Sequence, residues 1–397
     1  MKNILSTKKV SDITADIIGT NSDKSRFYYI DPDILYASRN KLVLGQVGSG
    51  KTSAVATNDA KQAIRRGESV VVTAHDYDIY DKTSNTAKEN GYEIKVLDMA
   101  NIKDTFDLIK WTAIQDAHFL AKTIIEYEDT DTAGYWKNAE EGLLTALILY
   151  VSKNHGSFKD IYEITSNKSI EELSELLDAD AEDETWQAYC DAIKKSYAPF
   201  RNTEARVQIQ ILTAINFYLA NYRDEPVNTI LNKENIDLSL PAKKPCIYYI
   251  INSGQVSRSG VLTAIFISLM IRKIYSYSET LTAAEFTDQV HVNFILDDFA
   301  QIGRIYRFDS VLSTVRSRKI SVTIIADILE QLQRLYPYEY QTILELCGTK
   351  MILGEMWEIN TIEYFERWNV DTSRTENNSL IVIPPFGDAE KLVKYTG

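Results

Sequence analysis

Cysteine and histidine are scarce in this chain of 397 residues, which has three of the former and four of the latter. The cysteines, Cys190, Cys246 and Cys347, are far apart and form no CxxC pair. An odd number of scattered thiols is typical of reduced cysteines in the cytoplasm and predicts no disulfide framework. The histidines show no spacing typical of metal ligands, so the sequence gives no support to a zinc site.

Long hydrophobic runs are also missing. The two longest apolar-leaning runs cover 142–151 and 261–271, whereas a helix needs about 20 such residues to cross a bilayer. We therefore interpret both runs as buried helices of a protein core. At the N-terminus, Lys2, Lys8 and Lys9 are followed by a polar stretch instead of an apolar one, which predicts no secretion signal.

Positive charge is in deficit, since 43 Lys and Arg residues face 56 Asp and Glu residues and the formal net charge is -13. Binding along phosphate backbones needs clustered Lys and Arg, so this balance argues against a general nucleic-acid coat. It leaves open a locally basic loop or pore. Short basic clusters lie at 61–66, 194–195 and 316–319, and for the first two we favour a solvated helix face or turn.

The first third of the chain alternates between strand and helix patterns. Residues 41–44 form a short apolar run, and 69–73 and 93–97 are rich in the aliphatic residues typical of buried parallel strands. Residues 52–66 have helical character and are followed by Gly67, a common helix terminator. Strands that alternate with helices predict an α/β fold with a mainly parallel central sheet.

Residues 112–220 have a different character, with apolar residues at helical spacing and no convincing strand pattern. We interpret this segment as an inserted all-α domain; the alternative is that its helices simply cover the sheet. The predicted organisation is an α/β domain in two parts, residues 1–111 and 221–397, interrupted by the all-α domain. A chain of this length has room for such an insertion.

Strand patterns return after the helical segment. They lie at 246–251, 292–296, 320–326, 350–353 and 380–383. The last run is followed by Pro384 and Pro385, and because proline cannot donate a ladder hydrogen bond, we expect this strand to close an edge of the sheet. A short strand at 28–30 and a turn at 31–33 are predicted near the N-terminus.

A glycine-rich loop joins the predicted strand at 41–44 to the predicted helix at 52–66. Its residues are Gly45, Gln46, Val47, Gly48, Ser49, Gly50, Lys51 and Thr52, which fit the pattern G-x-x-x-x-G-K-[ST] in full. Glycines allow a tight turn that brings backbone amides against phosphates, and the helix N-terminus adds positive potential. Lys51 would neutralise the β- and γ-phosphates of ATP, and Thr52 would place its hydroxyl on Mg²⁺. A glycine-rich turn without a ligand is the alternative, against which the flanking strand and helix argue.

An acidic pair follows the apolar strand at 292–296. In Walker B motifs such a strand delivers an acid to the edge of the sheet where ligands of α/β folds lie. Asp297 would anchor Mg²⁺ through its water shell. Asp298 occupies the place where many ATPases carry Glu to orient the attacking water, so we expect it to act in catalysis, with slower hydrolysis from the shorter side chain. The alternative is an acidic pair that only caps the next helix.

Three arginines, Arg304, Arg316 and Arg318, follow the acidic pair. An arginine from a neighbouring subunit can stabilise charge on a transferred phosphate. Among the three we favour Arg316 and Arg318 as catalytic residues, because they come just before the strand at 320–326. A surface arginine, or one paired with an acid, is the alternative for each.

Taken in order, these motifs resemble the coupling proteins of conjugative type IV secretion systems, the TraG/TraD-type ATPases. The similar segments, beginning at Leu42, include 71–73, 79–83, 90–98, 135–139, 296–303, 316–321, 331–332 and 353–354. The segment Leu296-Asp297-Asp298-Phe299-Ala300-Gln301-Ile302-Gly303 is similar to the family's acidic DE-F-x-x-x-G box. The resemblance implies a RecA-like P-loop nucleotide-binding domain, a hexameric ring with nucleotide between subunits, and substrate recognition through the all-α domain.

Three departures from the family pattern predict an altered catalytic rate more than altered nucleotide binding. Residues 74–78 stand where members commonly have Asp-Pro-Lys-Gly-Glu, and 107–108 stand where they have Asn-Pro. Asp327 takes the place of a sensor glutamine ahead of Gln331. Most members also begin with transmembrane helices, whereas none is predicted here. We therefore expect a soluble form or a chain cut at the membrane boundary, cytoplasmic and peripheral at the inner face of the cell membrane.

The resemblance favours an ATPase that takes relaxase-bound DNA or protein substrates to a secretion channel. It implies relaxase, relaxosome or secreted proteins as partners of the all-α domain, with single-stranded DNA, channel ATPases and membrane components as further partners of a homo-hexamer. One alternative is a nucleotide-gated docking adaptor with little or no hydrolysis. Another is a DNA-pumping motor of the FtsK and HerA type, against which the helical insertion argues.

Overall fold

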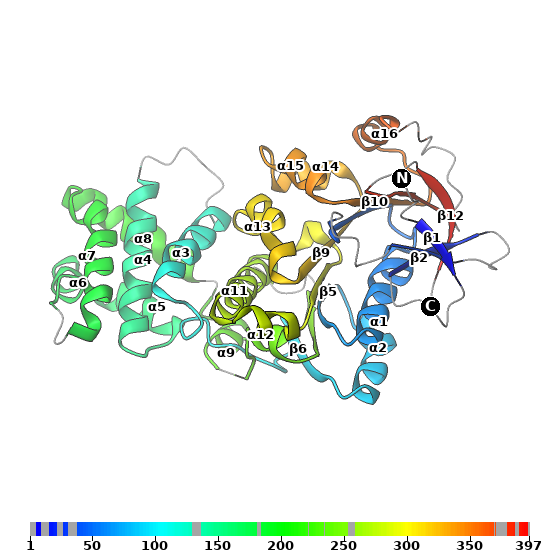
Figure 1. The fold of residues 1–397 in the computed structure, drawn as a ribbon. Helices are drawn as coiled ribbons and strands as arrows, with labels where there is room; N and C mark the ends of the chain where they lie inside the picture. Colours follow the sequence, from blue (N-terminus) through cyan, green and yellow to red (C-terminus); the bar gives the residue numbers. More distant parts are fainter. Residues whose placement is uncertain are drawn as a thin grey trace.

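A twelve-stranded mixed sheet organises the part of the chain that the computed structural model describes (Figure 1). The described residues are 5–8, 16–21, 27–30, 38–128, 136–180, 184–220, 222–233, 235–252, 259–368, 370, 379–385 and 389–395. The strand order is β1-β3-β2-β12-β11-β10-β4-β9-β8-β5-β7-β6. Strands that are far apart in sequence, such as β4 and β9, are therefore neighbours at the centre of the sheet.

The strands divide into a parallel block and an antiparallel flank. The parallel block consists of β10 (Thr349–Leu353), β4 (Lys41–Leu44), β9 (Ile320–Ala326), β8 (Val292–Leu296), β5 (Ser69–Ala74), β7 (Cys246–Ile251) and β6 (Glu93–Asp98). The antiparallel flank consists of β11 (Ser379–Ile383), β12 (Glu390–Lys394), β2 (Asp16–Thr20), β3 (Phe27–Ile30) and β1 (Leu5–Lys8). The mainly parallel sheet predicted from the sequence is confirmed.

The predicted edge strand before Pro384 is not an edge. Strand β11 lies between β10 and β12 and pairs antiparallel with both. The two prolines come after its last residue, Ile383, so they end the strand without removing a ladder hydrogen bond from it. A proline at this position fixes where the strand stops, whereas its lateral neighbours depend on chain segments elsewhere. The turn predicted at 31–33 lies outside the described residues.

Helices cover both faces of the parallel block (Figure 1). Because successive strand residues point to opposite faces, Val43 packs in the core with η2 and α1, whereas Leu42 and Leu44 pack in the core that contains α11. The helices and helical turns of this α/β part are η2 (Thr52–Ala56), α1 (Thr57–Arg65), α2 (Asp78–Glu89), α9 (Val227–Leu231), α10 (Leu240–Lys243), α11 (Ser259–Thr280), α12 (Ala283–Asp288), η4 (Phe299–Gln301), α13 (Phe308–Thr314), η5 (Val315–Arg318), α14 (Leu329–Leu335), α15 (Tyr340–Leu346) and α16 (Ile359–Glu366).

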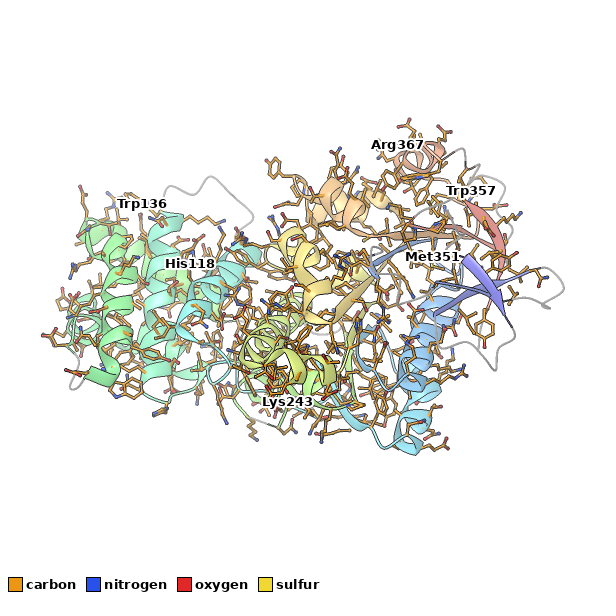
Figure 2. The ribbon with its side chains drawn as sticks, viewed as in Figure 1. His118, Trp136, Lys243, Met351, Trp357 and Arg367 are labelled. Carbon is orange, nitrogen blue, oxygen red and sulfur yellow. The ribbon has the colours of Figure 1, made fainter. Side chains whose placement is uncertain are left out.

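A separate group of helices lies at one end of the molecule (Figure 1). It contains α3 (Ile114–Glu128), α4 (Lys137–Lys153), α5 (Phe158–Asn167), α6 (Ile170–Leu177), η3 (Glu184–Trp186), α7 (Gln187–Arg201) and α8 (Ala205–Ala220). Figure 2 shows His118 and Trp136 in this group, with Met351 and Trp357 toward the other end of the molecule. Gly142 of α4 lies so close to the Ser196 carbonyl of α7 that an added Cβ would overlap it. The described residues between 112 and 220 contain no strand.

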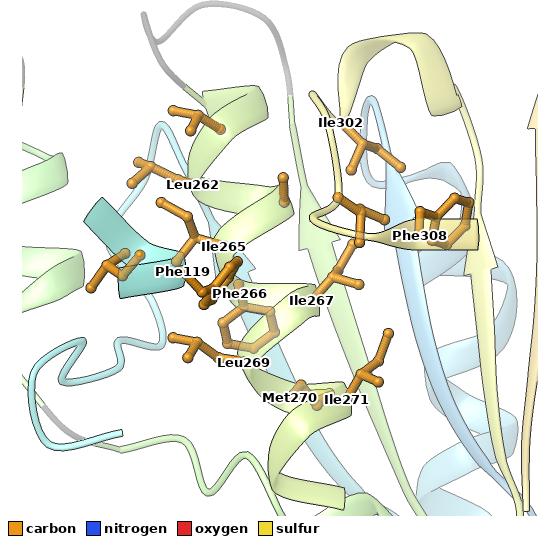
Figure 3. Close-up of a cluster of buried hydrophobic side chains, with 14 of the residues drawn as sticks. Phe119, Leu262, Ile265, Phe266, Ile267, Leu269, Met270, Ile271, Ile302 and Phe308 are labelled. Atoms are coloured by element: carbon orange, nitrogen blue, oxygen red, sulfur yellow. The ribbon is translucent and has the colours of Figure 1, made fainter. Parts of the chain in front are cut away.

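Helix α11 joins the helical group to the sheet. Among the described helices it is long and apolar enough to span a membrane, with a mean hydropathy of 1.3, but 78% of that stretch is buried in the protein. Figure 3 shows its side chain Phe266 near Phe119 of α3, while Ile302 and Phe308 lie on the side toward the sheet. The interpretation of 261–271 as a core helix therefore agrees with the packing.

A buried acidic group, Glu68, stabilises the end of the parallel block at which β5 begins. Burial alone would raise its pKa, but Arg39 (3.1 Å) and Arg66 (2.8 Å) hold the pKa at about 2. We expect Glu68→Gln to lower the free energy of unfolding by about 3 kcal/mol at pH 7. The depressed pKa places the loss of this stabilisation in acid, as pH falls from about 4.5 toward 2.

Urea titrations of wild type and Glu68→Gln at pH 7 and pH 3 measure this effect. The exposed Glu89→Gln of α2 is a matched control and should change stability little. An equal difference between wild type and Glu68→Gln at both pH values would contradict the assignment.

Candidate phosphate-binding site

The glycine-rich loop lies at the carboxyl end of β4, in the middle of the parallel block. Gly48 and Gly50 adopt φ angles of 81° and 82°, a left-handed conformation that costs glycine little. Gly45 is held closely from two sides, because an added Cβ would lie 2.6 Å from the Ser49 hydroxyl and 2.7 Å from the Leu353 carbonyl. The loop therefore has the tight turn and close backbone approach that its sequence predicts.

Lys51 points back into this loop. Its Nζ donates to the carbonyl oxygens of Gly45 and Gln46 (3.1 Å for the latter) and to Asp327 Oδ1 at 2.7 Å. Its side chain is only 8% exposed. The ammonium group that would bind a phosphate is thus positioned by the loop itself and by an acid that directly follows the neighbouring strand β9.

The hydroxyl of Thr52 meets the acidic end of β8. Thr52 Oγ1 donates to Asp297 Oδ2 at 2.7 Å, and the Asp297 main-chain carbonyl accepts from Thr73 Oγ1 at 2.8 Å. Burial raises the pKa of Asp297 to about 6, with a contribution from neighbouring Asp298, while the Thr52 hydrogen bond opposes the rise. A hydroxyl and a carboxylate side by side form the all-oxygen donor set that Mg²⁺ prefers, so these residues fit the predicted ion.

Asp298 follows in a left-handed conformation with φ of 49°. Aspartate tolerates this region better than most residues, and the turn sends its side chain to the same cavity as the P-loop. That cavity has a volume of about 410 Å³ and is lined by Val47, Gly48, Gly50, Lys51, Thr52, Ser53, Asp78, Lys82, Asp298 and Asp327. The structure therefore brings together most of the predicted loop, the predicted catalytic Asp298, the sensor-position Asp327, and three side chains that the sequence did not indicate, those of Ser53, Asp78 and Lys82.

Two of these three residues come from α2, and Ser53 directly follows the P-loop. Asp78 and Lys82 lie one turn apart at the start of α2 and pair at 2.5 Å. Because α2 follows the carboxyl end of β5, the general rule that ligands lie at this edge could have indicated them. Asp327 follows β9 in the same way.

Lys394 of β12 also reaches the loop, and its Nζ donates to the Ser49 carbonyl at 2.6 Å. Burial lowers the pKa of Lys394. It is separated from Ser49 by 345 positions, so local sequence patterns give no signal for this contact.

The predicted arginines lie away from the cavity. Arg316 and Arg318 belong to η5, which precedes β9, whereas Lys51 lies beyond the carboxyl ends of the parallel strands. Arg318 pairs with Glu279 at 3.0 Å, and Arg304 pairs with Glu339. Within one chain the structure does not bring these arginines to the phosphate cavity.

Residues 2–368 match the family model of type IV secretory system conjugative DNA transfer. The chain belongs to this family. The resemblance inferred from the ordered motifs is therefore confirmed. A search of curated proteins finds no match.

Solved structures show the same fold. This family member is similar to the bacterial conjugative coupling protein TrwBdeltaN70 in complex with sulphate, with a TM-score of 0.69, 15% identity, and coverage of 90% of this chain and 86% of that chain. TrwB in complex with ADP and Mg²⁺ gives a TM-score of 0.70 at 15% identity and the same coverage. VirB4 of Thermoanaerobacter pseudethanolicus gives 0.55 at 10% identity, with 98% of both chains covered. The predicted fold class, a RecA-like P-loop domain with an inserted all-α domain, is confirmed.

Proposed function

We propose that this chain is an ATP-binding coupling protein that hydrolyses ATP, recruits relaxase-bound DNA or protein substrates to a conjugative type IV secretion channel, and drives their transfer. The observation that carries the proposal is that Lys51 and Thr52 line the phosphate cavity while Thr52 is hydrogen-bonded to Asp297 behind it. TrwB, which has a similar fold, has been solved with ADP and Mg²⁺ and with a non-hydrolysable ATP analogue. This supports the same class of ligand here.

The chain's own residues divide the work at the phosphates. The loop amides and Lys51 bind and orient the anion. Thr52 Oγ1 and the Asp297 carboxylate would hold Mg²⁺, which would supply positive charge beside the phosphates. Asp298, whose side chain lines the same cavity, would accept a hydrogen bond from the attacking water and orient it.

A ring arrangement would complete this site. Arg316 and Arg318 lie at the strand end opposite the P-loop, so either can serve ATP only in a neighbouring subunit. An arginine supplied from a neighbouring protein is a known way to stabilise phosphoryl transfer. We therefore propose a homo-hexamer as the active form, cytoplasmic and peripheral at the inner face of the membrane, in contact with channel ATPases and membrane components.

A packed path connects the acidic pair to the helical group. Phe299, directly after Asp298, stacks on Phe308 with ring centroids 5.5 Å apart. Ile302 and Phe308 pack beside α11, whose other side faces Phe119 of α3 (Figure 3). A rigid element in contact with both sites can transmit a change from one to the other. This supports the proposal that the all-α domain, residues 112–220, receives the cargo and responds to nucleotide.

The proposal predicts that ATP hydrolysis by the full chain rises with single-stranded DNA or with oligomerisation. The measurement is phosphate release with and without a single-stranded oligonucleotide, alongside solution mass from light scattering. Double-stranded DNA of the same length and charge per strand is the matched control. An oligomeric chain that binds ATP but hydrolyses it at one rate with or without DNA would contradict DNA-coupled transport.

A nucleotide-gated docking adaptor is the second candidate. Two residues that line the cavity favour it. Asp298 is one methylene shorter than the glutamate that many ATPases carry at its position, and Asp327 puts a negative charge where family members carry a neutral sensor glutamine. In that case Mg-ATP binds but is scarcely turned over. Single-turnover hydrolysis with Mg²⁺ separates the two functions, since only the adaptor would retain intact ATP after many minutes in an assembled ring.

A further inference from the structure

Asp327 has a fixed place beside the P-loop. It follows β9, which pairs in parallel with β4 so that Ala326 lies opposite Leu44. The Asp327 carbonyl accepts from the Gly45 amide at 3.2 Å. Gln331 donates from Nε2 to Asp327 Oδ2 at 3.2 Å and accepts from the Asp327 amide at 2.9 Å. Both the backbone and the carboxylate of Asp327 are thus held at the phosphate cavity.

The carboxylate occupies a donor that a phosphate would need. A lysine ammonium group has three N–H donors. In Lys51 they face the Gly45 carbonyl, the Gln46 carbonyl and Asp327 Oδ1. The two carbonyls belong to the loop, so the exchangeable partner is Asp327, whose side chain is 30% exposed. A nucleotide phosphate must therefore replace this carboxylate to bind Lys51.

The second cation among the residues that line the cavity, Lys82, is engaged by another acid. Asp78, Asp298 and Asp327 line it together with Lys51 and Lys82. Lys82 already pairs with Asp78 at 2.5 Å. Once a phosphate takes Lys51, Asp327 stays beside that anion, because its main chain and Gln331 hold it in place. The Asp327 carboxylate and a phosphate beside the same ammonium group would repel each other about as strongly as the two charges of a salt bridge attract.

We propose that Asp327 sets the nucleotide preference of the phosphate cavity, since its carboxylate competes with the terminal phosphate for Lys51 and weakens ATP binding more than ADP binding. The inference rests on the proposed function, because it assumes that this cavity binds nucleotides. ATP carries one more phosphate than ADP, and the lysine of a P-loop, here Lys51, contacts the β- and γ-phosphates. The repulsion therefore falls mainly on ATP.

Asp327→Asn removes the charge while keeping the shape and a hydrogen-bond acceptor for Lys51. We expect it to increase the affinity for a non-hydrolysable Mg-ATP analogue about tenfold and that for Mg-ADP less, so that the ratio of the two affinities rises. The measurement is calorimetric titration of the full chain with each nucleotide, with thermal unfolding as a check on folding. Asp327→Ala provides a second variant if the asparagine variant is poorly folded.

Asp78→Asn is the matched control, since it removes one negative charge from the same cavity without touching Lys51. The expected result is a smaller change in the ATP to ADP ratio than in Asp327→Asn. An unchanged ratio in Asp327→Asn, with binding that still depends on Lys51, overturns the inference and leaves the proposed function intact. If wild type and Asp327→Asn bind neither nucleotide, both the inference and the proposed function fall.

Discussion

Lys51→Ala is expected to lower the affinity for Mg-ATP by about 100-fold or more and to abolish measurable hydrolysis. The ammonium group is the one cation in the cavity that the loop carbonyls orient toward the phosphates. Its removal also leaves the Asp327 carboxylate without its 2.7 Å partner, which adds repulsion to the loss of attraction. Equilibrium titration with a fluorescent ATP analogue, together with phosphate release, measures both effects.

Lys82→Ala is the matched control for this substitution. Lys82 lines the same cavity but pairs with Asp78 and lies at the more exposed start of α2. We expect less than about a fivefold change in affinity, which is typical of a screened surface cation. Normal ATP hydrolysis by Lys51→Ala would remove the P-loop mechanism altogether.

Asp297→Asn is expected to lower Mg²⁺-dependent hydrolysis by about 100-fold or more and, at the same time, to make the fold more stable. The second effect follows from the pKa of Asp297, which burial raises to about 6. A raised carboxyl pKa means that ionisation costs folding free energy as the pH rises from about 4 to 6, and the cost is about 3 kcal/mol at pH 7. The neutral asparagine removes that cost and can still accept the Thr52 hydrogen bond. Thermal unfolding in EDTA and phosphate release in Mg²⁺ measure the two effects.

Asp298→Asn separates the two roles of the acidic pair. It should also slow hydrolysis, because Asp298 is proposed to orient water, but it should retain Mg²⁺-dependent nucleotide binding. Asp297→Asn should lose the Mg²⁺ dependence of binding. A destabilised Asp297→Asn, or one that hydrolyses ATP at the wild-type rate, would argue against Asp297 as the buried magnesium ligand.

The P-loop could be predicted because its chemistry is contiguous in the sequence. The conformations of Gly48 and Gly50 depend on residue type and immediate neighbours, and the flanking strand and helix are visible as hydrophobic patterns. Asp297 could be predicted for a related reason, since an acid at the end of a buried strand comes to the carboxyl edge of any parallel sheet. The boundaries of the all-α domain stay a prediction, although its helices run from Ile114 to Ala220.

The order of the strands across the sheet could not be predicted from such local patterns. Strand β11 looked like an edge because of Pro384, yet β12 pairs on its far side. The same strand β12 carries Lys394 to the Ser49 carbonyl. No local hydrophobic period or motif indicates either contact, because each depends on which distant segments of the chain become neighbours in the folded sheet.

The order of residue types along the chain is enough to predict that a phosphate-binding turn joins a buried strand to a helix, and that an acid at the end of a later strand could serve Mg²⁺. The groups from distant segments that surround Lys51 meet only when the chain folds. Parallel pairing of β9 with β4 sets Asp327 within 2.7 Å of its Nζ, while the same pairing leaves Arg316 and Arg318 at the far strand ends. Backbone conformation is governed by near neighbours, whereas the electrostatic field at a site is summed over groups that only the folded chain brings together.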